Sequence, residues 1–161
     1  MLPRGHIISG IILILAVFIL SPQINFIYLA LLFLASFLID FDHYTASVLK
    51  TKRWGLKNAL DYNNKKMIEE KKEKAKGIKA KDDFHFFHTV EFHVFVGFLS
   101  VLWIGFFYVF VGMVYHSLLD IFSLIRGGSF HRREFFLFDW VRKKSKKADN
   151  SFCKKQESRN P

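Results

Sequence analysis

The stretch Phe37-Leu38-Ile39-Asp40-Phe41-Asp42-His43 interrupts an otherwise apolar part of the chain. No charged residue occurs from Ile24 to Ile39, and then two carboxylates and an imidazole follow within four positions. A carboxylate beside lipid is energetically costly, so it usually has a partner such as a metal ion or a cationic side chain. These three side chains therefore require partners elsewhere in the chain.

The composition indicates an integral membrane protein. Apolar residues make up 51% of the 161 residues and 20 residues are Phe, yet 24 are Lys or Arg. The apolar and the basic residues occupy separate parts of the chain, which is typical of apolar spans joined by basic extramembrane segments. The single cysteine, Cys153, excludes a disulfide framework within the chain and a cysteine-based zinc site.

Two apolar runs make up the N-terminal part, residues 1–43. Ile7 to Leu20 ends at a polar turn around Pro22, and the second run, Ile24 to Ile39, ends at Asp40. As helices, these runs are about 21–24 Å long, somewhat short for a hydrocarbon core of about 30 Å. A cleaved signal peptide is the alternative for the first run, but no small-x-small cleavage site precedes the turn. We expect a first transmembrane hairpin.

The middle of the chain changes character twice. Residues 44–84 become strongly charged, and we expect a basic cytoplasmic loop that is either a solvated helix or, in part, disordered. Residues 85–125 are apolar again, and as one helix they would be about 60 Å long, twice a bilayer. We therefore expect a second transmembrane hairpin, with spans near 89–103 and 107–124 and a bend at 104–106.

The distribution of basic residues supports two hairpins. With this topology Arg4, the 12 basic residues of 44–84 and the 11 from Arg126 onward lie on one side, and the hairpin turns carry none. The positive-inside rule predicts this partition of 24 against zero. The expected fold class is an all-α, multi-pass integral protein of the inner (cytoplasmic) membrane, with four short transmembrane helices as two hairpins and both termini cytoplasmic.

The C-terminal part is basic throughout. Residues 126–140 interleave aromatic and basic side chains, as expected of a segment at the membrane interface, whose partners would be membrane lipid and anionic lipid headgroups. Residues 141–161 are Lys-rich, and we expect a disordered tail. A net charge of +10 would fit nucleic-acid binding, but no aromatic-platform motif accompanies it, so no specific nucleic acid is expected.

The ionisable residues of the apolar segments gather at one face of this topology. Odd helices run outward and even helices run inward, so the relevant helix ends all lie at the cytoplasmic face. The residues at these ends are His6; Asp40, Asp42 and His43; His88 and Glu91; and His116 and Asp120. Spacings of i,i+3 and i,i+4 place paired members on shared helix faces. Such a layer can hold one or two divalent metals, with zinc favoured and manganese or iron as alternatives.

Each of these groups also has an alternative structural role. His6 can cap a helix, the stretch 40–43 can act as an N-cap, and Glu91 suits the first turn of a helix because of the macrodipole. His116 with Asp120 is the strongest pair, because an unpaired Asp deep in an apolar helix is costly. Three further histidines stay open as site residues or as surface and core residues: His85, His93 and His131.

The order of these motifs resembles that of the YdjM-like family of inner-membrane-associated proteins, whose metal-dependent hydrolase activity is itself inferred. Gly-His, Asp-x-Asp-His, a His-rich helix entry and His-x-x-x-Asp follow one another over roughly residues 5–125. The resemblance implies metal-binding roles for His6, Asp40, Asp42, His43, His116 and Asp120. The family's third motif, His-Arg-Gly-x-Thr-His-Ser, is altered here. Either His88 and His93 keep its histidine spacing, or His88 matches the second histidine and Asp83 replaces the first.

Motifs and resemblance together predict a hydrolase with its metal site at the cytoplasmic membrane face, acting on a phosphoester or lipid-like substrate. Asp42 and Glu91 are the candidate catalytic residues, with Glu91 as a general base. Arg126, Arg132 and Arg133 are candidate partners of a substrate phosphate. The alternatives are a non-catalytic metal-binding or structural membrane protein and a di-iron membrane oxidase, which usually needs more histidines than the seven present here.

Overall fold

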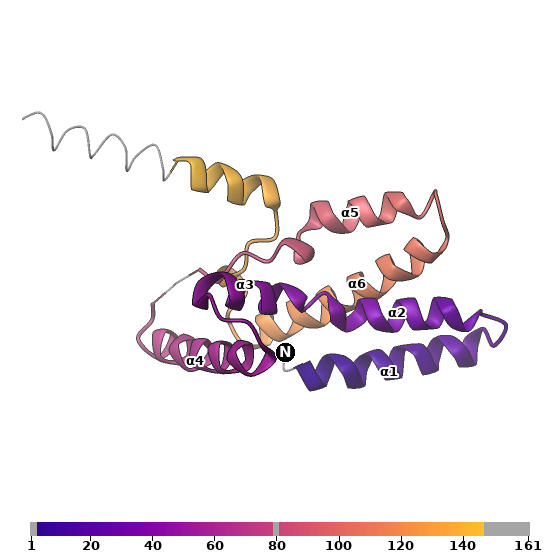
Figure 1. Cartoon of the computed structure of the whole chain (residues 1–161), viewed down its shortest axis with the longest axis horizontal. Coiled ribbons are helices and arrows are strands. Elements are labelled where there is room, and N and C mark those ends of the chain that lie inside the picture. Colours follow the sequence, from indigo (N-terminus) through magenta and orange to yellow (C-terminus); the bar gives the residue numbers. More distant parts are fainter. Residues whose placement is uncertain (1–2, 79–80, 147–161) are drawn as a thin grey trace, which may run out of the picture.

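The computed structural model describes residues 3–78 and 81–146, and the regular structure in these ranges is helical, without strands (Figure 1). The labelled helices are α1 (Pro3–Leu20), α2 (Phe26–Leu38), α3 (Phe41–Thr51), α4 (Leu56–Ala75), α5 (Val90–Leu99) and α6 (Gly105–Arg126). Two short 3-10 helices, η1 (Phe86–His88) and η2 (Phe130–Arg132), precede α5 and follow α6. The prediction of an all-α chain is confirmed.

The helices α1 and α2, and likewise α5 and α6, form two hairpins. Their connecting turns lie toward the same end of the molecule, on the right in Figure 1, and α3 and α4 lie at the other end. Within residues 3–78 and 81–146, two stretches are long and apolar enough to cross a membrane: Phe26–Thr51, which combines α2 with α3, and Gly105–Arg126. The apolar helices at Gly5–Leu20 and Val90–Leu99 are shorter.

The second hairpin differs in detail from the expected one. A span near 89–103 was expected, but α5 ends at Leu99 and turns fill residues 100–104. With 10 residues, α5 is about 15 Å long, half a typical hydrocarbon core. The Trp103 ring covers the start of α6 so closely that a Cβ on Gly105 would lie 2.4 Å from it. This contact explains a sharp bend that no Pro or Asn marks in the sequence.

The most extensive helix contact joins α2 and α6. A Cβ on Gly112 would lie 2.4 Å from the Leu32 carbonyl oxygen and 2.9 Å from the Ala35 Cβ, so the absence of a side chain permits this close approach. The buried apolar centre beside the contact contains Ile39, Val96 and Met113. The contact therefore holds the end of α2, just before Asp40, against the helix that carries His116 and Asp120.

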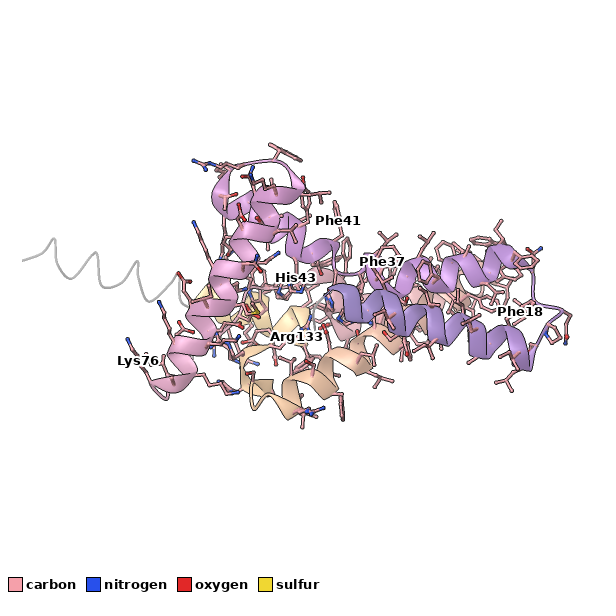
Figure 2. All side chains as sticks on the ribbon, turned by 90° about the horizontal axis from the view of Figure 1, so that it is seen from below. Phe18, Phe37, Phe41, His43, Lys76 and Arg133 are labelled. Carbon is pink, nitrogen blue, oxygen red and sulfur yellow. The ribbon has the colours of Figure 1, made fainter. Side chains whose placement is uncertain are left out.

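Large apolar side chains cover the outside of the hairpins. Ile12 on α1 is 60% exposed, Phe98 on α5 is 71% exposed and Phe122 on α6 is 63% exposed. Exposed apolar faces of this extent favour contact with lipid or another apolar partner. In Figure 2, His43 and Arg133 lie between the apolar hairpin end near Phe18 and the charged end near Lys76.

The charged loop contains a helix. Of the two alternatives for residues 44–84, the structure has the helix over Leu56–Ala75, and Arg132 donates to Glu73 of α4 at 3.0 Å. Residues 137–146 are also helical, although a disordered tail was expected from residue 141. The remainder of that expected tail, residues 147–161, lies outside the described residues.

Candidate metal centre

Four helical elements bring their polar residues to one point. His6 lies near the start of α1, Asp40 stands between α2 and α3, and His88 ends η1. His116 and Asp120 lie one turn apart on α6. The sequence-based prediction that these groups share one end of the hairpins agrees with their positions in the structure.

A tight cluster is formed by His6, Asp40, His116 and Asp120, whose candidate ligand atoms all lie within 4.8 Å of one another. His116 Nε2 is 3.3 Å from Asp40 Oδ1 and 3.6 Å from Asp120 Oδ2. His6 Nε2 is 3.2 Å from Asp120 Oδ1, and the His6 ring stacks on that of His116 at 4.0 Å. Nitrogen and carboxylate oxygen donors in this arrangement suit zinc, manganese or iron.

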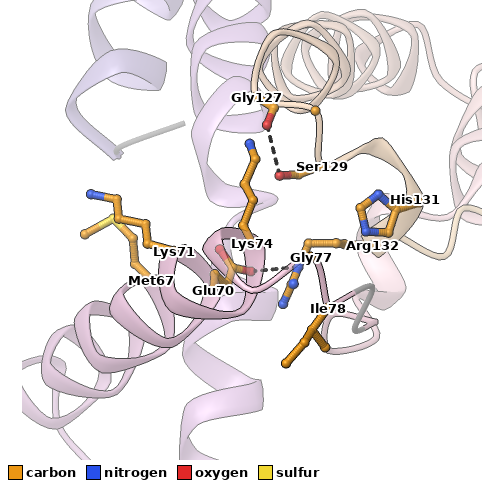
Figure 3. Close-up of a pocket in the computed structure, with 11 residues that line it drawn as sticks. Met67, Glu70, Lys71, Lys74, Gly77, Ile78, Gly127, Ser129, His131 and Arg132 are labelled. Carbon is orange, nitrogen blue, oxygen red and sulfur yellow. Dashed lines mark hydrogen bonds and ion pairs between the residues drawn. The ribbon is translucent and has the colours of Figure 1, made fainter.

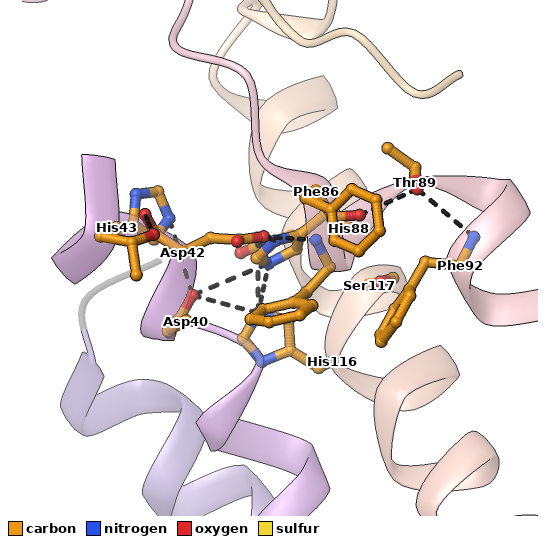
Figure 4. A network of polar contacts seen from close by, with 12 residues as sticks. Asp40, Asp42, His43, Phe86, His88, Thr89, Phe92, His116 and Ser117 are labelled. Atoms are coloured by element: carbon orange, nitrogen blue, oxygen red, sulfur yellow. Dashed lines mark hydrogen bonds and ion pairs between the residues drawn. The ribbon is translucent and has the colours of Figure 1, made fainter. Parts of the chain in front are cut away.

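His88 adds a fifth donor to the cluster (Figure 4). Its Nε2 lies 3.3 Å from His116 Nε2, 3.8 Å from Asp40 Oδ1 and 3.7 Å from Asp120 Oδ2. Burial, and then the nearby Arg133 charge, lowers the pKa of His88 well below its usual value. A neutral imidazole of this kind is the form that binds a metal.

The outer nitrogens of two rings are held by hydrogen bonds. His116 Nδ1 lies 2.7 Å from the Ser36 carbonyl oxygen, and His88 Nδ1 lies 3.2 Å from Asp42 Oδ2. Because a carbonyl can only accept, His116 Nδ1 carries the hydrogen and the lone pair of the neutral ring is on Nε2, which faces the cluster. Carboxylates and carbonyls orient metal-binding histidines in this way. Asp42 therefore orients the His88 ring toward the cluster.

The position of Asp42 itself is fixed by the backbone. The Phe87 amide donates to Asp42 Oδ2 at 2.6 Å, which ties η1 to the first turn of α3. Thr89 ends η1 by donating to the Phe86 carbonyl at 2.8 Å and accepting from the Phe92 amide. This N-cap starts α5 and sets the position of His88 just before it.

His43 and His85 form a second layer beside the cluster. His43 Nε2 is 3.6 Å from Asp40 Oδ1, and its ring lies 4.2 Å from that of His85. His85 is only 3% exposed, and neither ring nitrogen has a hydrogen-bond partner in the described part of the chain. Burial, with His43 and Arg133 nearby, lowers the pKa of His85 to about 3. His85, left open by the sequence, is thus a neutral imidazole next to the candidate centre.

Only one of the three candidate arginines reaches the cluster. Arg133 Nη1 donates to Asp120 Oδ2 at 2.7 Å, and its Nη2 is buried without a partner among the described residues. Arg132 instead donates to Glu73 of α4 at 3.0 Å, and Arg126 is exposed at the end of α6. Arg133 therefore brings a cation with spare hydrogen-bonding capacity to the edge of the site.

Three predicted or open residues are engaged elsewhere. Glu91 accepts hydrogen bonds from the Leu137 amide at 3.0 Å and the Phe138 amide at 3.3 Å, so the structure does not bring it into the cluster. His93 Nδ1 donates to the Thr89 carbonyl, and its Nε2 faces Ser117 Oγ at 2.9 Å. His131 lies in a separate hollow.

That hollow has a volume of about 310 Å³ and lies between α4 and the end of α6 (Figure 3). Lys71, Lys74, His131 and Arg132 line it together with Glu70. Arg132 lies 3.4 Å from Glu70 and 3.0 Å from Glu73, so its charge is largely compensated. The hollow is therefore a packing junction between α4 and α6, distinct from the cluster.

In its described residues the protein is thus all-helical, with two candidate membrane spans and a buried His/Asp group that could hold a metal ion. No protein-family model, no curated protein and no solved structure matches the chain. The likeness of its motifs to the YdjM-like family stays a prediction from the sequence.

Proposed function

We propose that the chain is a membrane-embedded, metal-dependent hydrolase whose centre is built by His6, Asp40, His88, His116 and Asp120. The observation that carries this proposal is the convergence of two oriented imidazoles on two carboxylates. The Nε2 atoms of His88 and His116 lie 3.3 Å apart, and both face Asp40 and Asp120. Arg133 balances the charge of Asp120, and the remaining carboxylate of Asp40 together with the two imidazole lone pairs favours a further cation.

A divalent metal bound there would acidify a water molecule and polarise the scissile bond. Among the carboxylates of the centre, Asp40 has the most exposed side chain, at 21%, and we assign to it the acceptance of a proton that then passes to solvent. We assign to Arg133 the binding of an anionic group of the substrate beside Asp120. Asp42 holds His88 in the required tautomer.

We also propose an orientation of the two hairpins in the membrane. We place both hairpin turns on the far side of the inner membrane and the cluster, α3 and α4 at the cytoplasmic face. The partition of 24 basic residues against zero supports this orientation. Because α5 is about 15 Å long, the second hairpin crosses with the aid of the turns at residues 100–104. Cysteine accessibility at Ser21 and Lys57 in sealed vesicles tests it.

Metal analysis of the purified chain in lipid nanodiscs tests the centre. We expect about one divalent ion per chain, with loss of the ion in His116→Gln. The exposed His131→Gln is the matched control and should retain the ion. Absence of a stoichiometric divalent ion in the unaltered protein contradicts the proposal.

An activity assay then separates a hydrolase from its rivals. We expect metal-dependent cleavage of a generic aryl phosphate, with loss in Asp40→Asn. Metal binding without turnover of phosphate or carboxylate esters would instead indicate the non-catalytic metal-binding protein. The three imidazoles of the cluster disfavour a di-iron oxidase. An iron-dependent absorbance band would support the di-iron oxidase over the hydrolase.

A further inference from the structure

An apolar groove lies between α5 and α6 and ends at the metal centre. Its volume is about 320 Å³, within the range of small-molecule pockets. The apolar lining includes Val90 and Val94 of α5 and Phe110, Val114, Leu118 and Ile121 of α6. His88 and Arg133 line the same groove, so it reaches the candidate centre directly.

The polar groups along the groove are not all alike. His93 and Ser117 also line it, but they bond to one another at 2.9 Å and His93 bonds to the Thr89 carbonyl at 2.8 Å. They offer little to a polar ligand. Arg133 differs, because Nη1 is bonded to Asp120 while the buried Nη2 has no partner among the described residues. The groove is thus apolar along its length and cationic where it meets the site.

The groove is also accessible from the side. Val94 is 49% exposed and Leu118 is 59% exposed, so both form an open rim, whereas Phe110 and Val114 are half-buried. Phe110 and Val114 precede His116 on the candidate span Gly105–Arg126, toward the hairpin turn, and this part of the groove therefore lies at a depth where lipid chains are the surroundings. The alkyl chain of a lipid can therefore enter the groove directly from the bilayer, without passing through water.

We propose that this groove holds the alkyl chain of a membrane amphiphile and places its anionic headgroup at Arg133, beside the metal centre. This inference rests on the proposed function and specifies its substrate class: a phosphate-bearing amphiphile with a hydrocarbon chain. Charge complementarity selects the headgroup, because Arg133 supplies the one unsatisfied guanidinium nitrogen at the junction of the groove and the cluster in the described residues. Burial of apolar surface against the lining of the groove favours a ligand with an alkyl chain.

Photo-crosslinking with a defined probe tests the groove. The probe is dodecyl phosphate with a diazirine at the chain end, supplied in phosphatidylcholine nanodiscs that contain the full chain. We expect adducts to concentrate on groove residues such as Val94, Val114 and Leu118, with few on Phe122. An even spread of adducts around α6 overturns the proposal, since it reports ordinary lipid contact.

Matched variants sharpen the result. Leu118→Trp fills the groove, whereas Phe122→Trp, one turn further along α6 and similarly exposed, leaves it open. We expect adducts to fall about tenfold in the first and to stay unchanged in the second. Val94→Trp on α5 is an independent groove-filling variant in case the first one misfolds. Unchanged labelling in correctly folded groove variants overturns the proposal.

The headgroup preference is tested by comparing dodecyl phosphate with dodecanol that carries the same diazirine, so that the two probes differ only in the headgroup. We expect the phosphate probe to label about tenfold more strongly, and Arg133→Gln to remove the difference. Equal labelling by both probes overturns the role of Arg133. Metal content is measured on the same samples, so that the two proposals are tested separately. Groove labelling without bound metal supports the groove and contradicts the proposed hydrolase. Bound metal without groove labelling supports the metal centre and contradicts the groove.

Discussion

The Nε2 atoms of His88 and His116 lie 3.3 Å apart, although the second nitrogen of each ring is hydrogen-bonded elsewhere. The Ser36 carbonyl fixes the hydrogen of His116 on Nδ1, and the Asp42 carboxylate orients His88 in the same sense. Two neutral rings of this tautomer would point their lone pairs at each other, so the two Nε2 atoms must share either a proton or a cation. A divalent cation bound to both lone pairs is the occupant that we propose.

Removal of that cation is expected to destabilise the folded chain. A ligand that binds only the folded state adds about 2.7 kcal/mol at a free concentration of one hundred times its Kd. The melting temperature in nanodiscs should therefore fall after chelation and recover when zinc is added. His116→Gln should show no response to either treatment. A wild-type melting temperature that ignores the chelator would contradict the presence of the site.

Asp42→Ala is expected to weaken metal binding without removing a ligand. The substitution frees His88 Nδ1 and removes the acceptor of the Phe87 amide, so the imidazole loses its orientation. Loss of such an outer partner typically lowers metal affinity about 10- to 100-fold. Competition with a fluorescent zinc chelator measures this change. Asp61→Ala, at an exposed position of α4, should leave the affinity unaltered. Complete loss of metal would instead make Asp42 a ligand.

The general location of the site could be predicted because helix direction alternates along the chain. Once the apolar runs are taken as hairpins, His6, Asp40, His88 and His116 must fall at one end, whatever the details of packing. The spacing of His116 and Asp120 similarly places both on one face of α6. Pattern and periodicity were therefore sufficient to predict the all-α class and to group these four residues at one end of the hairpins.

The roles of individual residues depended on contacts that no periodicity encodes. Glu91 has the right spacing from His88, yet the amides of residues 137 and 138 bind its carboxylate. Arg133 is one of three similar arginines, and only the path of the chain after η2 brings it to Asp120. Ser36, one turn before Asp40 within an apolar run, was the sequence signal that could have indicated a polar contact there.

Stability is expected to decline in acid because of an ion-pair cluster that holds α4 in place. Burial would raise the pKa of Asp83, but hydrogen bonds from Lys50 and Lys66, and then from Tyr62, outweigh it and hold this pKa far below its usual range. The unfolded chain takes up the proton first, at its ordinary pKa of about 3.9. The stabilisation is therefore complete above that pH and is lost as the pH falls below it.

Thermal unfolding of wild type and Asp83→Asn between pH 3 and 7 measures this contribution. The variant should be less stable at neutral pH, and the two curves should converge as the pH is lowered. Asp61→Asn is the matched control and should follow the wild type throughout. A constant difference between wild type and Asp83→Asn at all pH values would exclude the ionised carboxylate as the cause.

Gly112→Leu is expected to disrupt the metal centre from a position that touches none of its ligands. The first atom of a side chain there would lie 2.4 Å from the Leu32 carbonyl oxygen, so α2 and α6 must separate. Such overpacking costs about 1–3 kcal/mol, and it moves the Ser36 carbonyl away from His116 Nδ1, one turn along α6. Both the melting temperature and the metal affinity should fall.

At Gly97 a Cβ would meet Phe110 at an ordinary 3.5 Å, so Gly97→Ala should preserve both the melting temperature and the metal affinity and serves as the control. Normal metal affinity in Gly112→Leu would show that the α2–α6 contact does not position the centre.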